Sequence, residues 1–243
     1  MVEFTFILPC LNEEKTLPFC IQEIANYIKT HQLNAEILVS DNNSEDNSIE
    51  VAKSYGARVS VCKERGYGNA LIHGTKNAYG KYCVMGDCDG SYDFSNLDEF
   101  IQKVREGYDL VVGNRFAGGI KEHAMPLSHK IGVRFLSGFA NFFFRTPIKD
   151  YHCGLRMYHT ESLKRIQLSC PGMEYASEMI IKAKLNHLKM CEVPTILRKD
   201  LRDKKPHLRT IRDGFRHLFL ILNLFMNRKK YIVGEKNDEK NNA

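Results

Sequence analysis

The sequence predicts an α/β protein with a doubly wound, mostly parallel sheet flanked by helices. Short apolar runs alternate with helical segments of about ten residues, the pattern of parallel strands joined by crossover helices. Polar, partly acidic residues follow several of these runs, and ligands bind at the carboxyl ends of strands in such folds. A chain of 243 residues is long enough to bury a sizeable core.

The first half of the chain supplies most of the predicted sheet. Apolar runs bounded by turn residues predict strands at 4–8, 36–39, 58–62, 82–85 and 109–112. The spacing of apolar residues predicts the intervening helices at 17–28, 48–55, 68–79 and 97–105. Pro9 is expected to end the first strand, because proline cannot donate a hydrogen bond to a strand ladder. Right-handed crossovers bring the loops after successive strands to one edge of the sheet.

The second half is less regular. Residues 127–145 and 174–186 have helical spacing, and 191–197 is strand-like. A basic run at 198–216 leads into 215–226, where apolar residues recur at near-helical intervals. Such a helix is too short to cross a bilayer, but it can lie at an anionic interface or pack on the domain.

Composition restricts the possible partners. The formal net charge of +6 favours anionic ligands such as nucleotides, phosphates or a membrane surface. Nucleic acid is not expected, because the basic residues are not interleaved with stacking aromatic residues. The eight cysteines form no C-x-x-C pair and fit reduced thiols of a cytoplasmic protein, with Cys88 as the exposed one. The N-terminal residues lack the pattern of a signal peptide, which agrees with cytoplasmic localisation.

Carboxylates cluster after the strand predicted at 82–85. Asp87 and Asp89 are one residue apart, and Asp93 follows closely. Carboxylates this close repel each other unless a cation lies among them, and oxygen ligands at this density suit Mg²⁺ or Mn²⁺. The alternative is an acidic turn, because Asp, Gly and Ser favour turns for local reasons. Asp41 follows the second predicted strand, so polar groups recur at one sheet edge, where a nucleotide diphosphate would fit.

The glycine pattern disfavours two common nucleotide-binding classes. No G-x-G-x-x-G follows the first strand and no G-x-x-x-x-G-K-[ST] occurs, which argues against a Rossmann oxidoreductase and a P-loop NTPase. Gly66 and Gly68 follow the third strand instead. They fit either a tight turn into a helix or a close approach of the backbone to a ligand.

Taken in order, the motifs resemble the family 2 glycosyltransferases with the GT-A fold. In the first half these motifs are Pro9-x-Leu11-Asn12-Glu13, Asp41-Asn-Asn-Ser and Asp87-Cys-Asp89-Gly. Later motifs resemble the polyprenyl-phosphate branch, which includes dolichol-phosphate mannosyltransferase and bacterial undecaprenyl-phosphate sugar transferases: Asn114-Arg115-Phe116, Met125-Pro126, Asp150-x-x-Cys-Gly154-Leu-Arg156, Gly172-Met-Glu-Tyr-Ala-Ser-Glu178-Met and Lys205-Pro-His-Leu-Arg209-x-x-x-Asp213-Gly-Phe-Arg-His217. The resemblance implies a GT-A catalytic domain at 1–210, with 1–115 for the nucleotide-sugar and 116–210 for the acceptor. The residues that follow predict an amphipathic helix at 211–226 and a frayed polar tail at 227–243.

The resemblance implies metal-dependent transfer of a sugar from a UDP- or GDP-sugar to a polyprenyl phosphate, with inversion. Its nucleotide-sugar residues would be Pro9, Leu11, Glu13, Asp41, Asp87, Arg202, Lys205, His207 and Arg209. Its Mg²⁺ or Mn²⁺ ligands would be Asp87, Asp89 and Ser91, although relatives often carry Gln at the last position. Its acceptor-phosphate residues would be Arg115, Lys130 and Arg134. Its catalytic residues would be Asp89, Arg115 and Asp150.

The chemistry of the reaction supports these residue types independently. A cation stabilises the charge that develops on the departing nucleoside diphosphate. A phosphate monoester nucleophile is already anionic near neutral pH and needs positioning rather than a strong base. A saccharide hydroxyl acceptor, as in cell-surface polysaccharide synthesis, is the alternative and would need a base such as Asp150. A protein that only binds a nucleotide-sugar is the third possibility.

Structural roles are the alternative for each acceptor-side residue. Arg115 can cap a strand end or pair with Asp109, and Asp150 can be a turn residue. Lys130 and Arg134 can form a solvated helix face, which is the usual place of such residues.

Membrane contact is expected to be peripheral. Many relatives carry membrane-spanning helices after the Asp-Gly-x-Arg-His segment, whereas this chain offers only the short apolar stretch 215–226. We therefore expect attachment to the cytoplasmic face of a membrane through that helix, or through a membrane partner protein, in cell-envelope biogenesis.

Overall fold

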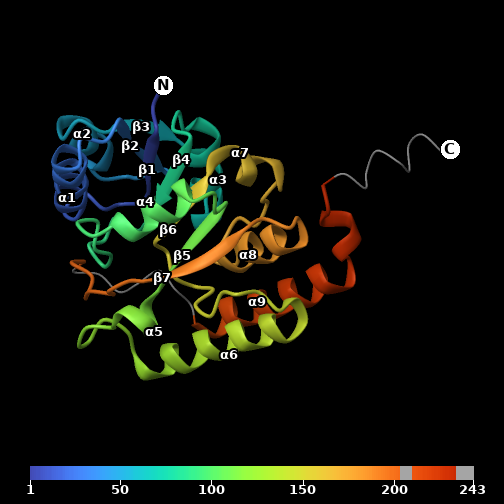
Figure 1. The fold of residues 1–243 in the computed structure, drawn as a ribbon. Helices are drawn as coiled ribbons and strands as arrows, with labels where there is room; N and C mark the ends of the chain where they lie inside the picture. Colours follow the sequence, from blue (N-terminus) through green and yellow to red (C-terminus); the bar gives the residue numbers. More distant parts are fainter. Residues whose placement is uncertain (203–209, 234–243) are drawn as a thin grey trace.

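The computed structural model describes residues 1–202 and 210–233, which contain one seven-stranded sheet flanked by helices (Figure 1). Its strand order is β3-β2-β1-β4-β6-β5-β7. The strands are β1 Phe4–Cys10, β2 Ala35–Asp41, β3 Arg58–Val61, β4 Tyr82–Met85, β5 Leu110–Asn114, β6 Arg156–His159 and β7 Met190–Pro194. All neighbouring pairs are parallel except those of β6, which is antiparallel to β4 and β5. The predicted α/β fold with a mostly parallel sheet is confirmed.

Strand β1 is central to the first half of the sheet. All seven of its residues are buried, because β2 and β4 flank it and helices cover both faces. The strand continues through Pro9 to Cys10, beyond its expected end. Proline is tolerated there because β4 ends at Met85, opposite Ile7, so that Pro9 pairs only with Ser40 of β2.

Strand β6 is an element that the sequence analysis missed. It reads Arg-Met-Tyr-His, and its charged first residue breaks the apolar pattern of a buried strand. In the structure Arg156 is fully buried, and its guanidinium donates to the carbonyl oxygens of Tyr151, Cys153 and Ala176 at 2.7, 2.9 and 3.0 Å. These hydrogen bonds offset the cost of burying the charge. The expected parallel order is therefore interrupted between β4 and β5.

Helices cover both faces of the sheet (Figure 1). On one face, a hydrogen bond of 2.6 Å from Tyr27 to Asp98 joins the first and fourth helices. The helices on that face are α1 Leu17–Thr30, α2 Ser48–Ser54 and α4 Asp98–Arg105. The helices on the other face are α3 Tyr67–Asn77, α7 Thr160–Arg165 and α8 Tyr175–Leu185. The short α5 Arg115–Gly118 follows β5 directly.

Two long helices, α6 Leu127–Phe144 and α9 Thr210–Met226, lie side by side at one end of the molecule (Figure 1). The rings of Phe143 and Phe225 join them, with centroids 4.7 Å apart. Helix α9 also packs on the domain, because its Ile221 and Leu224 are buried in the same core as the sheet. Across residues 1–202 and 210–233, no helix has both the length and the apolar character that a bilayer crossing requires.

Two smaller features could not be predicted from the sequence pattern. The segment predicted as a polar tail starts with a 3₁₀ helix, Arg228–Tyr231, and its residues 234–243 lie outside the described residues. Asn186 of α8 holds it by donating to the Tyr231 carbonyl at 2.9 Å and accepting from the Val233 amide at 2.7 Å. Cys88, expected to be exposed, is buried, and its thiol donates to a backbone carbonyl of β1 at 3.0 Å. Hydrogen bonds to main-chain atoms therefore hold both the 3₁₀ helix and Cys88 in place, and sequence patterns do not reveal such bonds.

Candidate active site

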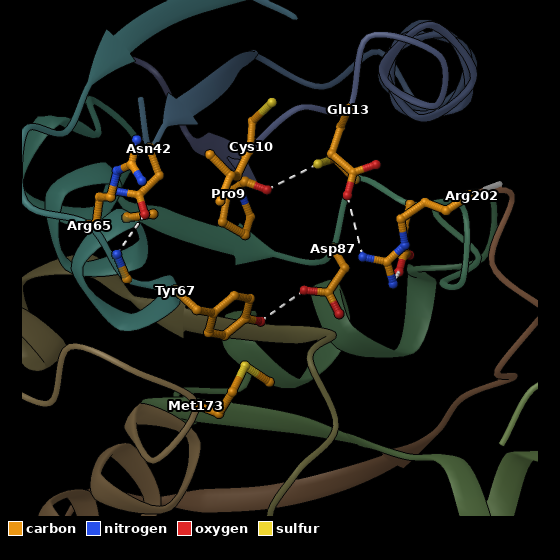
Figure 2. Close-up of a pocket in the computed structure, with 14 residues that line it drawn as sticks. Pro9, Cys10, Glu13, Asn42, Arg65, Tyr67, Asp87, Met173 and Arg202 are labelled. Atoms are coloured by element: carbon orange, nitrogen blue, oxygen red, sulfur yellow. Dashed lines mark hydrogen bonds and ion pairs between the residues drawn. The ribbon is translucent and has the colours of Figure 1, made fainter. Parts of the chain in front are cut away.

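A cavity of about 290 Å³ opens at the carboxyl ends of β1, β2 and β4, and we call it the strand-end pocket (Figure 2). Six of the residues expected to bind the nucleotide-sugar or the cation line it: Pro9, Leu11, Glu13, Asp87, Asp89 and Arg202. They come from the end of β1, the loops after β1 and β4, and the segment after β7. The polar loops therefore meet at one sheet edge, as the topology predicted.

The sequence analysis missed several residues that also line the pocket, among them Asn42, Arg65, Tyr67 and Met173. Asn42 accepts a hydrogen bond from the Gly66 amide at 2.6 Å and donates to the Glu64 carbonyl at 2.8 Å. These bonds join the end of β2 to the start of α3. The only sequence signal for Asn42 was its place in the polar run after the second strand.

Gly66 and Gly68 are required by a close backbone contact. Gly66 has a φ of +138°, and a Cβ there would lie 2.2 Å from the Pro171 carbonyl oxygen. A Cβ on Gly68 would lie 2.1 Å from the Cys170 carbonyl oxygen. The chain before α8 thus passes directly against the start of α3, which only glycine allows. This contact helps to bring Met173 to the pocket wall.

Asp87 is enclosed in the wall of the strand-end pocket. Its Oδ1 accepts a hydrogen bond of 2.9 Å from the Tyr67 hydroxyl (Figure 2). Burial and repulsion from Asp89 raise the pKa of Asp87 to about 6, although Tyr67, Arg202 and Arg115 act in the opposite direction. Burial and the neighbouring carboxylate therefore both disfavour the charged form of Asp87, and a cation at the two carboxylates would relieve the repulsion between them.

Asp87 and Asp89 fit a divalent cation whose remaining ligands would come from a diphosphate and water. Among the described residues, no three His, Cys, Asp or Glu side chains gather as a full ligand set. Mg²⁺ does not need such a set, because its sites commonly combine one or two carboxylates with substrate phosphates and water. Ser91, expected as a third ligand, does not line the pocket. Its amide donates to Asp89 Oδ1 at 2.9 Å, so it orients Asp89 instead.

Arg202 places its guanidinium between two carboxylates of the pocket (Figure 2). Its Nη2 lies 2.6 Å from Asp89 Oδ2, and its Nη1 lies 3.3 Å from Glu13 Oε1. Burial raises the pKa of Glu13, and a hydrogen bond from Thr16 only partly opposes this. The other cationic residues expected at the diphosphate lie outside the described residues: Lys205, His207 and Arg209.

Asp41 is completely buried and does not line the pocket. Its Oδ2 accepts hydrogen bonds from the amides of Asn43 and Ser44 at 3.1 and 3.2 Å, which fix the turn after β2. Its Oδ1 has no hydrogen-bond partner among the described residues. Buried acceptors are nearly always paired, so this oxygen has spare capacity for a donor group.

A second cavity of about 380 Å³ lies beside the start of α6, and we call it the α6 hollow. Its lining includes all three residues expected to bind the acceptor phosphate: Arg115, Lys130 and Arg134. The Arg134 guanidinium lies 4.6 Å from the ring centroid of Phe116. Lys130 and Arg134 form no ion pair with any carboxylate of the described residues. The hollow therefore offers cationic groups to an anion.

Arg115 is held by Asp150 rather than by Asp109. Its Nε donates to Asp150 Oδ2 and its Nη2 to Asp150 Oδ1, both at 2.8 Å. The Arg115 amide adds a third hydrogen bond to Oδ2 at 3.1 Å. Asp109 instead accepts from Ser162 at 2.7 Å and from the Lys189 amide at 2.9 Å. Asp150 has no solvent exposure, so its geometry suits positioning of Arg115 and leaves little room for a general base.

Comparison with known families decides the membership of this chain. The family model described as Glycosyl transferase family 2 matches residues 5–167. The chain belongs to glycosyl transferase family 2. The matched range contains the carboxylates of the strand-end pocket and the basic residues of the α6 hollow, but it ends before Met173 and Arg202.

Two relatives and one solved structure show how similar this glycosyltransferase is to known proteins. It is 33% identical over 220 residues to the low-salt glycan biosynthesis hexosyltransferase Agl6 of Haloferax volcanii, covering 89% of this chain and 52% of that protein. It therefore spans about half the length of that relative. It is 27% identical over 199 residues to a dolichyl-phosphate hexose transferase of the same organism, covering 80% and 84%. Glucosyl-3-phosphoglycerate synthase from Mycobacterium tuberculosis, solved with Mn²⁺, UDP-glucose and phosphoglyceric acid, matches with a TM-score of 0.73 at 18% identity, covering 90% and 79%.

These likenesses confirm the GT-A fold and the glycosyltransferase class that the sequence motifs predicted. The family match ends at residue 167, before the last residues that line the strand-end pocket. Met173 and Arg202 complete the strand-end pocket from a part of the chain that the family model does not reach. The pocket therefore combines residues inside the matched range with residues that lie beyond it in the sequence.

Proposed function

We propose that this family 2 glycosyltransferase uses a divalent cation to transfer a sugar from a nucleotide-sugar to a polyprenyl phosphate, with inversion. The observation that carries the proposal is the pairing of two cavities of opposite character. The strand-end pocket presents carboxylates, whereas the α6 hollow presents Arg115, Lys130 and Arg134. The two are close enough for Arg115 to lower the pKa of Asp87 against the effects of burial and of Asp89.

The strand-end pocket suits the nucleotide-sugar. Asp87 and Asp89 would hold Mg²⁺ or Mn²⁺ against the diphosphate, where the cation stabilises the negative charge of the leaving group. Tyr67 fixes Asp87 by its hydrogen bond, and the Ser91 amide fixes Asp89. Arg202 would add a cationic contact to the diphosphate. The synthase from Mycobacterium tuberculosis, which shares the fold, was solved with Mn²⁺ and UDP-glucose, in support of this donor.

The α6 hollow suits a phosphate acceptor. Asp150 holds the Arg115 guanidinium in one orientation, and Lys130 and Arg134 lie on successive turns of α6. A phosphate monoester oxygen is already anionic near neutral pH, so these residues need only place it in line with the anomeric carbon. The similarity to a dolichyl-phosphate hexose transferase supports a lipid-linked phosphate.

An exposed apolar surface beside the hollow suits a lipid bilayer. Helix α6 exposes Leu127, Ile131, Phe135 and Phe142, and helix α9 exposes Phe215, Phe219, Leu222 and Met226. Leu127 and Ile131 also line the α6 hollow, so the apolar surface continues into the cationic cavity. Basic residues at 228–230 follow α9 and would contact anionic headgroups. We infer peripheral attachment at the cytoplasmic face, with the acceptor phosphate reaching the hollow from the bilayer.

A soluble hydroxyl acceptor is the second candidate. The synthase of the same fold was solved with phosphoglyceric acid, which is a small soluble acid. A hydroxyl acceptor needs a general base, and both oxygens of Asp150 are bonded to Arg115. We therefore rank the polyprenyl phosphate first.

A transfer assay with the full chain tests the proposal. Radiolabelled UDP- and GDP-sugars are supplied with Mn²⁺ or Mg²⁺, with and without vesicles that contain undecaprenyl phosphate. The expected result is label in the lipid phase from one donor, lost in Asp89→Ala and in EDTA. The control is Glu64→Gln. Glu64 contacts the pocket residue Asn42 only through its backbone carbonyl, so this variant should keep activity.

Other outcomes would redirect the assignment. Cleavage of the nucleotide-sugar without lipid labelling would favour a hydroxyl acceptor or hydrolysis. Metal-dependent nucleotide binding without any turnover, in vesicles as well as in solution, would favour a binding protein. Activity that survives EDTA would contradict the role of the cation at Asp87 and Asp89.

A further inference from the structure

A short segment of the chain, residues 197–202, runs along the acidic loop 89–93, and we call it the basic strap. Two main-chain hydrogen bonds of 2.8 Å fasten the strap to the loop: the amides of Arg198 and Leu201 donate to the carbonyls of Ser91 and Asp89, and the first of these forms an isolated antiparallel bridge between Leu197 and Tyr92. The loop that carries Asp89 is therefore paired with a cationic segment outside the main sheet.

Arg198 anchors the strap at a point outside the strand-end pocket. Its guanidinium contacts Asp93 at 2.6 Å and Glu23 of α1 at 2.8 Å. Neither of these carboxylates lines the pocket. This end of the strap can therefore keep its partners whatever the pocket contains.

Arg202, at the other end of the strap, lies inside the pocket. Its Nη2 is 2.6 Å from Asp89 Oδ2 and its Nη1 is 3.3 Å from Glu13 Oε1. Its Nε is buried and has no hydrogen-bond partner among the described residues. Asp89 is also one of the two carboxylates proposed for the cation. Because a guanidinium and a divalent cation repel each other, the two compete for this carboxylate.

We propose that the basic strap is a charge-exchange device, in which Arg202 neutralises Asp89 until a divalent cation takes that carboxylate and then moves its guanidinium to the donor diphosphate. The inference rests on the proposed function, because the exchange needs a nucleoside diphosphate in the pocket. Arg198 acts as a positioning residue that keeps the strap in place while Arg202 changes partner. An arginine suits both partners, since its planar fork matches carboxylate and phosphate oxygens alike.

The exchange couples the binding of the cation to that of the nucleotide. A cation that binds alone must displace Arg202 from Asp89 and leave the guanidinium without that partner. When a diphosphate binds with the cation, the displaced guanidinium gains phosphate oxygens in return. Each ligand should therefore raise the affinity for the other, which is a coupling free energy between two adjacent sites.

Binding of Mn²⁺ to the full chain, followed by electron paramagnetic resonance of free Mn²⁺, tests the exchange without any acceptor. Wild type, Arg202→Gln and Lys199→Gln are titrated with Mn²⁺ alone, and UDP and GDP are then titrated at saturating Mn²⁺. Lys199 is the matched control, because it is an exposed cation on the same strap and forms no ion pair with described residues. Arg202→Gln should bind Mn²⁺ alone about tenfold more tightly and the nucleotide about tenfold more weakly, whereas Lys199→Gln should stay within about twofold of wild type.

A purely structural role of Arg202 would not make Mn²⁺ binding tighter and nucleotide binding weaker in the same variant. Unchanged or weaker Mn²⁺ binding by Arg202→Gln overturns the exchange. An equal change in Lys199→Gln also overturns it, because the effect would then be one of net charge. If Arg202→Gln does not fold, Arg202→Met decides in the same way, since methionine keeps an apolar stem without the positive charge and should bind Mn²⁺ more tightly than wild type. Neither titration involves turnover, so a failure of sugar transfer and a failure of the exchange are separate results.

Discussion

Asp87 of the strand-end pocket and Asp150 beside the α6 hollow have opposite electrostatic surroundings. Beside the α6 hollow, Asp150 is fully buried, and both of its oxygens accept hydrogen bonds from Arg115, which lines the hollow. In the strand-end pocket, Asp87 accepts one hydrogen bond from Tyr67 and forms no ion pair with a described residue. Burial and the nearby Asp89 raise the pKa of Asp87 to about 6. The Arg115–Asp150 ion pair is therefore complete, whereas Asp87 has no cationic partner among the described residues.

This difference distinguishes a carboxylate that positions an arginine, Asp150, from a carboxylate suited to bind a cation, Asp87. A buried ion pair such as Arg115 with Asp150 fixes the direction in which the guanidinium faces, and removal of either partner leaves an uncompensated charge. A carboxylate under repulsion, such as Asp87, is poorly satisfied by the protein and gains most from an added cation. Loss of Asp150 should therefore mainly lower stability, whereas loss of Asp87 should mainly lower activity.

The largest expected effect is on folding, from the substitution Asp150→Asn. The change leaves the Arg115 guanidinium buried without a counter-charge, so the free energy of unfolding should fall by about 3–5 kcal/mol. Urea unfolding followed by circular dichroism measures this. The double substitution Arg115→Met with Asp150→Asn removes both charges and should recover part of the loss. Wild-type stability of Asp150→Asn would show that the ion pair does not hold the hollow together.

The next effect is on catalysis, from the substitution Asp87→Asn. Transfer should fall about 10²- to 10³-fold, because one of the two carboxylates that hold the cation is lost. The free energy of unfolding, measured in EDTA, should stay the same or rise slightly, because the substitution removes a charge that repels Asp89. A loss of stability comparable to that of Asp150→Asn would break the comparison, since Asp87 would then be structural.

The strand-end pocket was partly predictable from the sequence because its acidic residues follow regular strands. Strands β1 and β4 have unbroken apolar runs, and polar residues at their ends must meet where the sheet is parallel. The position of Asp87 and Asp89 follows from local pattern and topology alone. The same reasoning located the α6 hollow less directly, because the spacing of Lys130 and Arg134 on a helix does not distinguish a binding face from a solvated one.

Other parts of the site depend on contacts between distant residues, which no local pattern carries. Met173 reaches the pocket because backbone carbonyls at 170 and 171 pack against Gly66 and Gly68. Strand β6 was missed because Arg156 is satisfied inside the fold by carbonyls of three other residues. In both cases the determining partners are backbone atoms, whose positions the side-chain sequence does not specify.

A third carboxylate, Glu178 of α8, sharpens the comparison because it lies near the strand-end pocket but is fully satisfied. It contacts Lys182 at 2.7 Å and accepts from the amides of Ser169 and Cys170 at 3.0 and 2.8 Å. Although burial alone would raise it, the pKa of Glu178 is lowered by Lys182 and by these amides. Glu178 therefore supports the backbone that packs against Gly68, and we expect it to behave like Asp150 rather than like Asp87.

The substitution Glu178→Gln should lower the free energy of unfolding near pH 7 by about 1–2 kcal/mol. A lowered pKa means that this contribution is present above the unfolded value of about 4.3 and is lost as the pH falls through the folded value. The difference between wild type and the variant, measured by urea unfolding from pH 3 to 7, should therefore shrink toward the acid end. A difference that stays constant with pH would mean that the charge of Glu178 contributes nothing.

The smallest expected effect concerns Lys130 and Arg134, the two cations of the α6 hollow that have no carboxylate partner among the described residues. Lys130→Ala and Arg134→Ala should each raise the KM for polyprenyl phosphate about tenfold, or roughly 1.4 kcal/mol, and leave stability and the KM of the donor nearly unchanged. The effect should diminish with added salt, because both side chains are open to solvent. Lys53→Ala, an exposed lysine of α2, is the matched control and should change none of these values. If Lys130→Ala instead raised the KM of the donor, the hollow would belong to the nucleotide-sugar, and the division between a cavity that awaits a cation and a cavity that awaits an anion would be wrong.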